Sequence, residues 1–202
     1  MTSYYVQTPT LAMRAGAVEL VVVARIGALQ KTDVETHDGK AYVRSTFDVH
    51  IDEVLKGTPA AKHLAVQVLG GKAGDVETPM SLPLQVGDTM VLMLSGATEP
   101  GVYVPYLASA YRVEPNGHVA LGARAAEVLG LHGAAAAADH GLTVEALRKL
   151  VGEVVRAQHD EEAAERAARA AGALPLPTLE LPTGHDGGGR SSAPEGGNPN
   201  RP

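Results

Sequence analysis

The chain of 202 residues has no cysteine and no tryptophan, and its only aromatic side chains are six tyrosines and one phenylalanine. The absence of cysteine excludes a disulfide scaffold, a cysteine-ligated metal site and thiol catalysis. Basic residues are also scarce, with 17 Lys and Arg against 23 Asp and Glu, for a net charge of −6. Nucleic acid is bound by a basic face and by aromatic rings on which bases stack. We therefore expect no nucleic-acid partner.

Long apolar runs are missing as well. No stretch approaches the roughly 20 apolar residues of a membrane-spanning helix, so no membrane span is expected. Residues 1–18 lack the charged start and apolar core of a secretory leader, which by itself indicates a cytoplasmic protein. The same observation fits a mature chain whose leader was replaced by Met1, or a start site placed too late.

Composition changes along the chain and predicts five segments. Residues 1–18 form a lead-in, and residues 19–122 hold nearly all the β-branched runs. An Ala/Gly-rich loop is expected over 123–142 and a helix over 143–172. Residues 173–202 are rich in Pro, Gly, Ser and Asn and have few large apolar side chains, so we expect a disordered tail. An alternative is that LPLPTLELP in this tail is a docking peptide.

Two long strands open the β-rich segment. Residues 19–29 are a β-branched run, and Asp38-Gly39 is a strong turn signal before the next run. In residues 41–55, apolar and polar side chains alternate, which predicts an antiparallel strand with one wet face. Phe47 falls on the apolar face, and the alternation slips at residues 53–55, which indicates a bulge or strand end.

Shorter strands follow at even spacing. Residues 90–94 are continuously apolar and predict a central strand buried on both faces. Asn116-Gly117 predicts a hairpin turn. The other expected strands cover 64–68, 102–104, 110–113 and 118–121. Five or six strands with short connections favour a small barrel or sandwich over a parallel sheet, which would need crossover helices.

The helix is predicted to begin at Thr143, a suitable N-cap, with Glu145 in the first turn. Its first half carries an apolar stripe that should dock on the barrel. The stripe consists of Val144, Leu147, Leu150, Val151, Val154 and Val155. From residue 158 the pattern weakens to alanine with charged i,i+4 pairs, so this half should project into solvent or pack on a partner.

Together these segments resemble a bacterial domain group related to the tissue inhibitors of metalloproteinases and the netrin modules. The most specific match is STFDVHIDEVLKGTP, which resembles the second strand of that group and the turn after it. TLAMRAGAVELVVVARI, LAVQVLGG, PLQVGDTMVLMLS, GVYVPYLASAYRVEPNG and GLTVEALRKLV resemble its other elements. The match covers roughly residues 9–155.

The resemblance implies an OB-like five-stranded barrel with a packed helix, in a group that is often exported. It thus favours an extracytoplasmic protein. In the animal inhibitors an N-terminal cysteine chelates the protease zinc. This chain has no cysteine, so metalloprotease inhibition is not transferred.

Candidate chemistry is sparse. His132, Asp139 and His140 could bind zinc if their loop folded back, although the spacing is not that of a helical pair. His50 lies between Asp48 and Asp52 on the wet strand face, where an acid–base cluster is geometrically possible. The alternative for His50 is ordinary solvated alternation.

No catalytic motif completes a site. Residues 70–75 (GGKAGD) only superficially resemble a phosphate loop, because no Ser or Thr follows a Gly-Lys pair and no helix start follows. We interpret them as a flexible barrel loop that could contact a partner. Ser45 and Ser95 lack the context of a nucleophile elbow.

The sequence therefore favours a non-enzymatic module that binds a protein partner or an extracytoplasmic ligand, with no cofactor. Its expected interaction surface combines a loop rim with the polar strand face: Gly70, Gly71, Lys72, Tyr42, Arg44, His50, Tyr103 and Tyr106. The alternatives are a metal-binding protein or hydrolase that uses the loop containing His132, Asp139 and His140, and an assembly subunit that self-associates through residues 156–171.

Overall fold

The computed structural model describes residues 9–96, 99–121 and 142–171. It is mainly β, with a helix at each end of the described chain. The elements are α1 (Leu11–Ala17), β1 (Leu20–His37), β2 (Lys40–Lys56), β3 (His63–Leu69), β4 (Gly71–Ala73), β5 (Val76–Thr78), β6 (Thr89–Gly96), β7 (Val102–Val113), β8 (Val119–Leu121) and α4 (Val144–Ala170). The loop predicted over 123–142 and the tail over 173–202 lie almost entirely outside the described residues.

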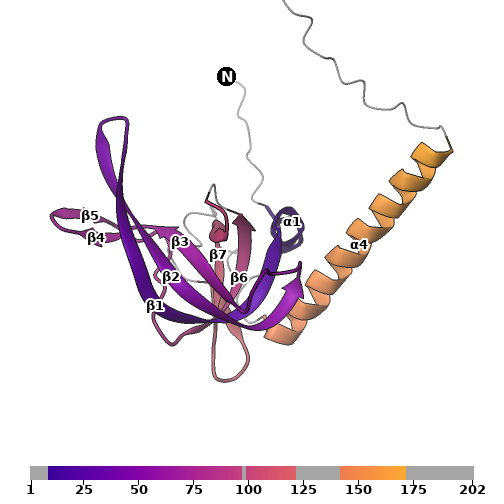
Figure 1. Cartoon of the computed structure of the whole chain (residues 1–202). Coiled ribbons are helices and arrows are strands. Elements are labelled where there is room, and N and C mark those ends of the chain that lie inside the picture. The colour runs from indigo at the N-terminus through magenta and orange to yellow at the C-terminus, as the bar shows by residue number, and fades with distance from the viewer. Residues whose placement is uncertain (1–8, 97–98, 122–141, 172–202) are drawn as a thin grey trace, which may run out of the picture. The chain divides into compact units, whose positions relative to one another are not determined.

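The main sheet has six strands in the order β3-β2-β1-β6-β7-β8. A further, parallel pairing of β3 with β7 joins Ala65 to Val102 and Val66 to Tyr103, so five of the strands form a partly closed ring. All other strand pairs are antiparallel. The predicted mainly β architecture with a C-terminal helix is thus confirmed, and Figure 1 shows the ring with the β1–β2 hairpin extending beyond it.

The β1–β2 hairpin is longer than the sequence predicted. β1 continues eight residues past Leu29 because Gln30–His37, though polar, pair with β2 as far as the turn. Asp38 and Gly39 both have positive φ, 49° and 73°, as a two-residue hairpin turn requires. The expected irregularity near residues 53–55 is confirmed by two register shifts between β1 and β2.

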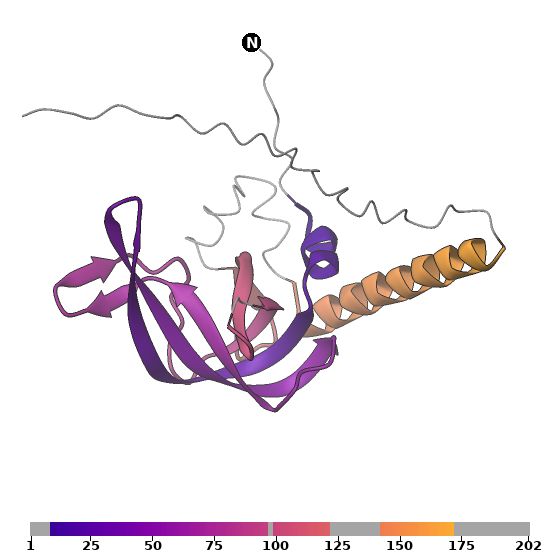
Figure 2. The same cartoon turned by 45° about the horizontal axis from the view of Figure 1, so that its top comes forward.

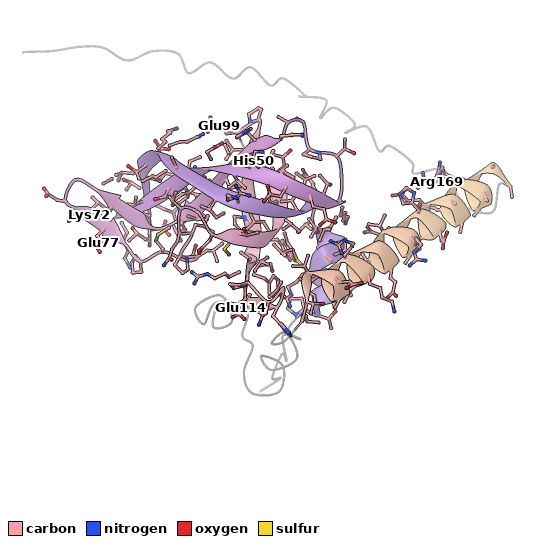
Figure 3. The ribbon with its side chains drawn as sticks, turned by 90° about the horizontal axis from the view of Figure 1, so that it is seen from below. His50, Lys72, Glu77, Glu99, Glu114 and Arg169 are labelled. Atoms are coloured by element: carbon pink, nitrogen blue, oxygen red, sulfur yellow. The ribbon has the colours of Figure 1, made fainter. Side chains whose placement is uncertain are left out.

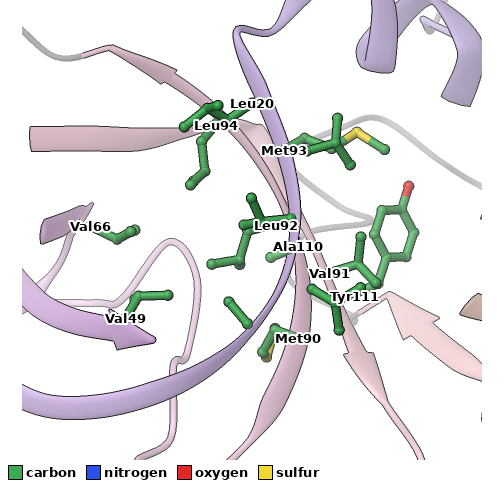
Figure 4. Packing of buried hydrophobic residues seen from close by; sticks show 14 of the residues in the cluster. Leu20, Val49, Val66, Met90, Val91, Leu92, Met93, Leu94, Ala110 and Tyr111 are labelled. Atoms are coloured by element: carbon green, nitrogen blue, oxygen red, sulfur yellow. The ribbon is translucent and has the colours of Figure 1, made fainter. Parts of the chain in front are cut away.

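The core lies inside the ring and follows the predicted alternation. Phe47 on β2 is buried, and residues 90–94 of β6 are buried on both faces, as expected. Figure 4 shows these β6 side chains in the same cluster as Leu20, Val49, Val66, Ala110 and Tyr111. One prediction was wrong: residues 102–104 and 110–113 belong to a single strand, β7, which pairs with β6 across a register shift near Leu92 and Leu94.

Both helices attach to the ring through few but specific contacts. Thr143 caps α4 by accepting a hydrogen bond from the Ala146 amide at 3.1 Å, and Leu147 and Val151 are fully buried. Lys56 Nζ donates to the carbonyls of Ala15 and Gly16 at 2.9 Å, at the C-terminal end of α1. A cation there satisfies carbonyls that have no partner within the helix.

Helix α1 and the hairpin β4–β5 were not predicted. α1 has only seven residues, of which Leu11, Arg14 and Ala15 are buried. A helix this short gives no recognisable hydrophobic periodicity in the sequence. The β4–β5 hairpin replaces the flexible loop expected over residues 70–75, and Figure 2 shows it beside the β1–β2 hairpin. The chain divides into two compact units, residues 1–162 and 163–202, and the groove and the histidines considered next belong to the first.

Candidate functional site

A groove of about 610 Å³ is lined by side chains of β1, β2 and β3 and by residues at and beside the β6–β7 connection. We call it the strand-face groove. Its lining is mostly polar: Lys31, Asp33, Glu35, Arg44, Gln67, Gly96, Glu99 and Val104. Glu99 lies at one edge of the ribbon in Figure 3, well apart from Lys72 and Glu77 on the β4–β5 hairpin.

Strand alternation places the groove's side chains on one face. Residues 31, 33 and 35 of β1 share a face because successive side chains of a strand point to opposite sides. Asp33 is the cross-strand partner of Arg44 on β2. Thr46 belongs to the same face, which the sequence predicted to be wet, yet it is only 7% exposed. The prediction failed there because Thr46 is flanked on both sides, by Lys31 on β1 and Gln67 on β3.

Arg44 is the central cation of the groove. Its Nε donates to Glu35 Oε2 at 2.7 Å, and one terminal nitrogen donates to Gln67 Oε1 at 3.3 Å. The guanidinium therefore spans from β1 to β3 and is held by partners on both sides. An oriented guanidinium of this kind recognises carboxylates better than a free one, because its donor geometry is fixed before a ligand arrives.

A second cation, Lys31, lines the groove from β1. Its Nζ is 3.0 Å from Asp33 Oδ2. The hydrogen bond and charge of Asp33, with a smaller contribution from the charge of Glu99, raise the pKa of Lys31 above its usual value. Lys31 therefore lies between acidic groups of β1 and of the β6–β7 connection, so the groove presents both signs of charge.

The predicted interaction residues fall in three places. Arg44 lines the groove, and Tyr42 precedes it by two residues on β2, opposite Glu35. Tyr103 and Tyr106 are half-buried on β7 and pack against the hydrophobic core. The sequence did not predict the other groove residues, which include Lys31, Gln67 and Glu99. They are far apart in the chain, and the pairing of distant strands brings them together.

The glycines predicted at the loop rim have a structural role. Gly70 has φ +117°, and a Cβ there would lie 2.3 Å from Met80 Cα. Gly71 has φ +130°, and a Cβ there would lie 2.3 Å from Ser45 Oγ. The chain needs glycine at both positions to turn from β3 into the hairpin. Lys72 is exposed on β4 and does not line the groove.

His50 lies outside the groove, on the same face of β2 nearer its end. The structure brings His63 of β3 beside it, which the sequence alone did not indicate. Asp48 and Asp52 complete the group: Asp52 lies near His50 and Asp48 near His63.

The metal site predicted at His132, Asp139 and His140 lies outside the described residues. Within the described ranges, no three or more His, Asp or Glu side chains gather in a group that could hold a metal ion. No helix in the same ranges has the length and apolar character to cross a membrane.

Comparisons with protein-family models, with curated proteins and with solved structures found no match to this chain.

Proposed function

We propose that this protein is a non-enzymatic binding module of OB-like architecture, and that the strand-face groove is its ligand site. The observation that carries the proposal is the position of the groove. OB folds bind ligands on the face of strands 2 and 3, between the loop joining strands 1 and 2 and the loop joining strands 4 and 5. In support, the strand-face groove is lined from β1, β2 and β3 and from the β6–β7 connection, and β6 and β7 would be the fourth and fifth strands of such a fold.

The proposed ligand is an extended protein segment that carries charges of both signs. Two cations and three carboxylates line the groove, and none of its lining residues in the described part of the chain is aromatic. This disfavours a nucleic-acid strand, which needs stacking rings and a basic surface. A carboxylate of the segment would bind Arg44, and a basic side chain would lie near Glu99. The resemblance to the tissue inhibitor and netrin group belongs to the same proposal and adds only the architecture to it.

A displayed library of random peptides, selected on the full chain, tests the proposal. Selected peptides should lose at least tenfold in affinity when Arg44→Glu removes the central cation. The double variant Glu35→Arg with Arg44→Glu exchanges the two charges and keeps an ion pair. It should fold as stably as the parent chain and still fail to bind, because the charge pattern of the groove is reversed.

Lys72→Glu is the matched control. It changes the charge of the other predicted surface, the β4–β5 hairpin, without touching the groove. Peptides that bind Arg44→Glu as tightly as the parent chain, or that are lost only in Lys72→Glu, would contradict the proposal.

Self-association through residues 156–171 is a second candidate. The side chains of residues 163–171 are exposed except for a half-exposed Ala168, and Arg169 pairs with Glu165 along the helix. Such pairs support a helix that has little tertiary packing. Light scattering decides it: a dimer that becomes a monomer on deletion of residues 156–202 supports assembly, and a monomeric full chain contradicts it.

A further inference from the structure

His50 on β2 and His63 on β3 are direct cross-strand partners. The Ile51 amide donates to the Lys62 carbonyl at 2.8 Å, so the neighbouring pair is the hydrogen-bonded one. Because the two kinds of pair alternate along an antiparallel ladder, His50 and His63 form a non-hydrogen-bonded pair, in which side chains come closest. Their ring centroids are 4.9 Å apart, with the rings at 68° to each other.

Each imidazole has its own carboxylate. Nδ1 of His50 lies 3.2 Å from Asp52 Oδ1, and Nδ1 of His63 lies 3.4 Å from both oxygens of Asp48. A carboxylate that accepts the Nδ1 proton selects the tautomer whose lone pair is on Nε2. Histidines that bind metals are held in this way, with the other ring nitrogen donating to a carboxylate.

The pair is open to solvent, since the side chains of His50 and His63 are 43% and 62% exposed. The carboxylates are held from β1. Arg25 lies 3.6 Å from Asp52, and a Cβ on Gly27 would be 3.0 Å from the Asp48 carboxylate. Gly27 thus leaves Asp48 the room to face His63.

We propose that His50 and His63 form a two-histidine site for a divalent cation of the zinc and copper class, with Nε2 of each ring as a ligand. Water would fill the remaining coordination positions. Two nitrogen ligands of a tetrahedral zinc are separated by roughly 3.3 Å, from Zn–N bonds of about 2.0–2.1 Å. Two imidazole rings that bind one such ion have centroids roughly 5 Å apart, and the centroids of His50 and His63 are 4.9 Å apart. Imidazole suits these ions better than Mg²⁺ or Ca²⁺, which prefer oxygen.

Calorimetric titration of the full chain with Zn²⁺ tests the site. We expect one saturable ion per chain at the pair, lost in the variant His50→Ala with His63→Ala, and no comparable binding of Mg²⁺. Asp48→Asn should weaken Zn²⁺ binding by about tenfold, because it removes the carboxylate that orients His63. Long-range ¹⁵N spectra of the imidazoles should show Zn²⁺ shifting Nε2 of both rings.

His132→Ala with His140→Ala is the matched control, since it removes the other pair of histidines suggested by the sequence. Binding should persist in that variant. The proposal is overturned if the parent chain binds no Zn²⁺ at millimolar concentration, if binding survives the loss of His50 and His63, or if it disappears with His132 and His140. Circular dichroism of each variant, expected to match the parent chain, excludes unfolding as the cause of a loss.

Discussion

The attachment of α4 to the ring makes the sharpest stability prediction, because two leucines on one helix differ in burial. Leu147 is fully buried in the core, whereas Leu150, one turn later, is only partly buried against it. Replacing Leu147 with alanine removes three carbon atoms from the core. At about 0.8 kcal/mol for each buried methylene, the transfer cost is roughly 2.4 kcal/mol.

A cavity adds to that cost, since comparable buried leucines lose about 2–5 kcal/mol on truncation. We expect Leu147→Ala to lower the free energy of unfolding by about 3 kcal/mol. Leu150→Ala should lower it by only ~1 kcal/mol, because the side chain already contacts water and its removal leaves little cavity.

Urea denaturation followed by circular dichroism at 222 nm measures both variants against the parent chain. The slope of the transition should stay the same, so that the midpoints report stability alone. Equal losses for the two variants, or a larger loss for Leu150→Ala, would refute the proposed docking of the helix through Leu147.

Three further predictions follow from single residues. Gly70→Ala should cost more than 2 kcal/mol, because a Cβ there meets Met80 while φ is positive; Gly74→Ala, with nothing near its Cβ and φ +58°, should cost about 1 kcal/mol in the same urea assay. The pKa of Glu53 is lowered from 4.5, chiefly by its hydrogen bonds from Arg148. A carboxyl with a depressed folded-state pKa stabilises the fold above its unfolded pKa, and that stability is lost as pH falls through the folded-state value. Glu53→Gln should therefore flatten the acid limb of stability against pH below 4.5, and an unchanged limb would exclude this pair as its cause.

The sequence predicted those parts of the fold in which local pattern and tertiary packing agree. The alternation in β2 identified Phe47 as a core residue, and the unbroken apolar run of β6 identified a strand buried on both faces. Asp38-Gly39 was recognisable as a turn because few dipeptides tolerate two positive φ angles.

Other elements could not be predicted, because tertiary contacts decide them. Gln30–His37 are too polar to indicate a strand, and they are one only because β2 pairs with them. Arg14 in α1 is 1% exposed, which no periodicity suggests, and it donates to the hydroxyl of Tyr111 at 2.6 Å. The strand-face groove and the partnership of His50 with His63 depend on the register of β2 with β3, which a single sequence does not encode locally.

Mapping a selected peptide onto the ¹⁵N-labelled full chain by amide chemical-shift changes tests the central claim most directly. The account predicts that the largest changes fall on Lys31, Arg44, Gln67 and Glu99, around the strand-face groove. Changes centred instead on Lys72 and the β4–β5 hairpin, or along α4, would contradict it.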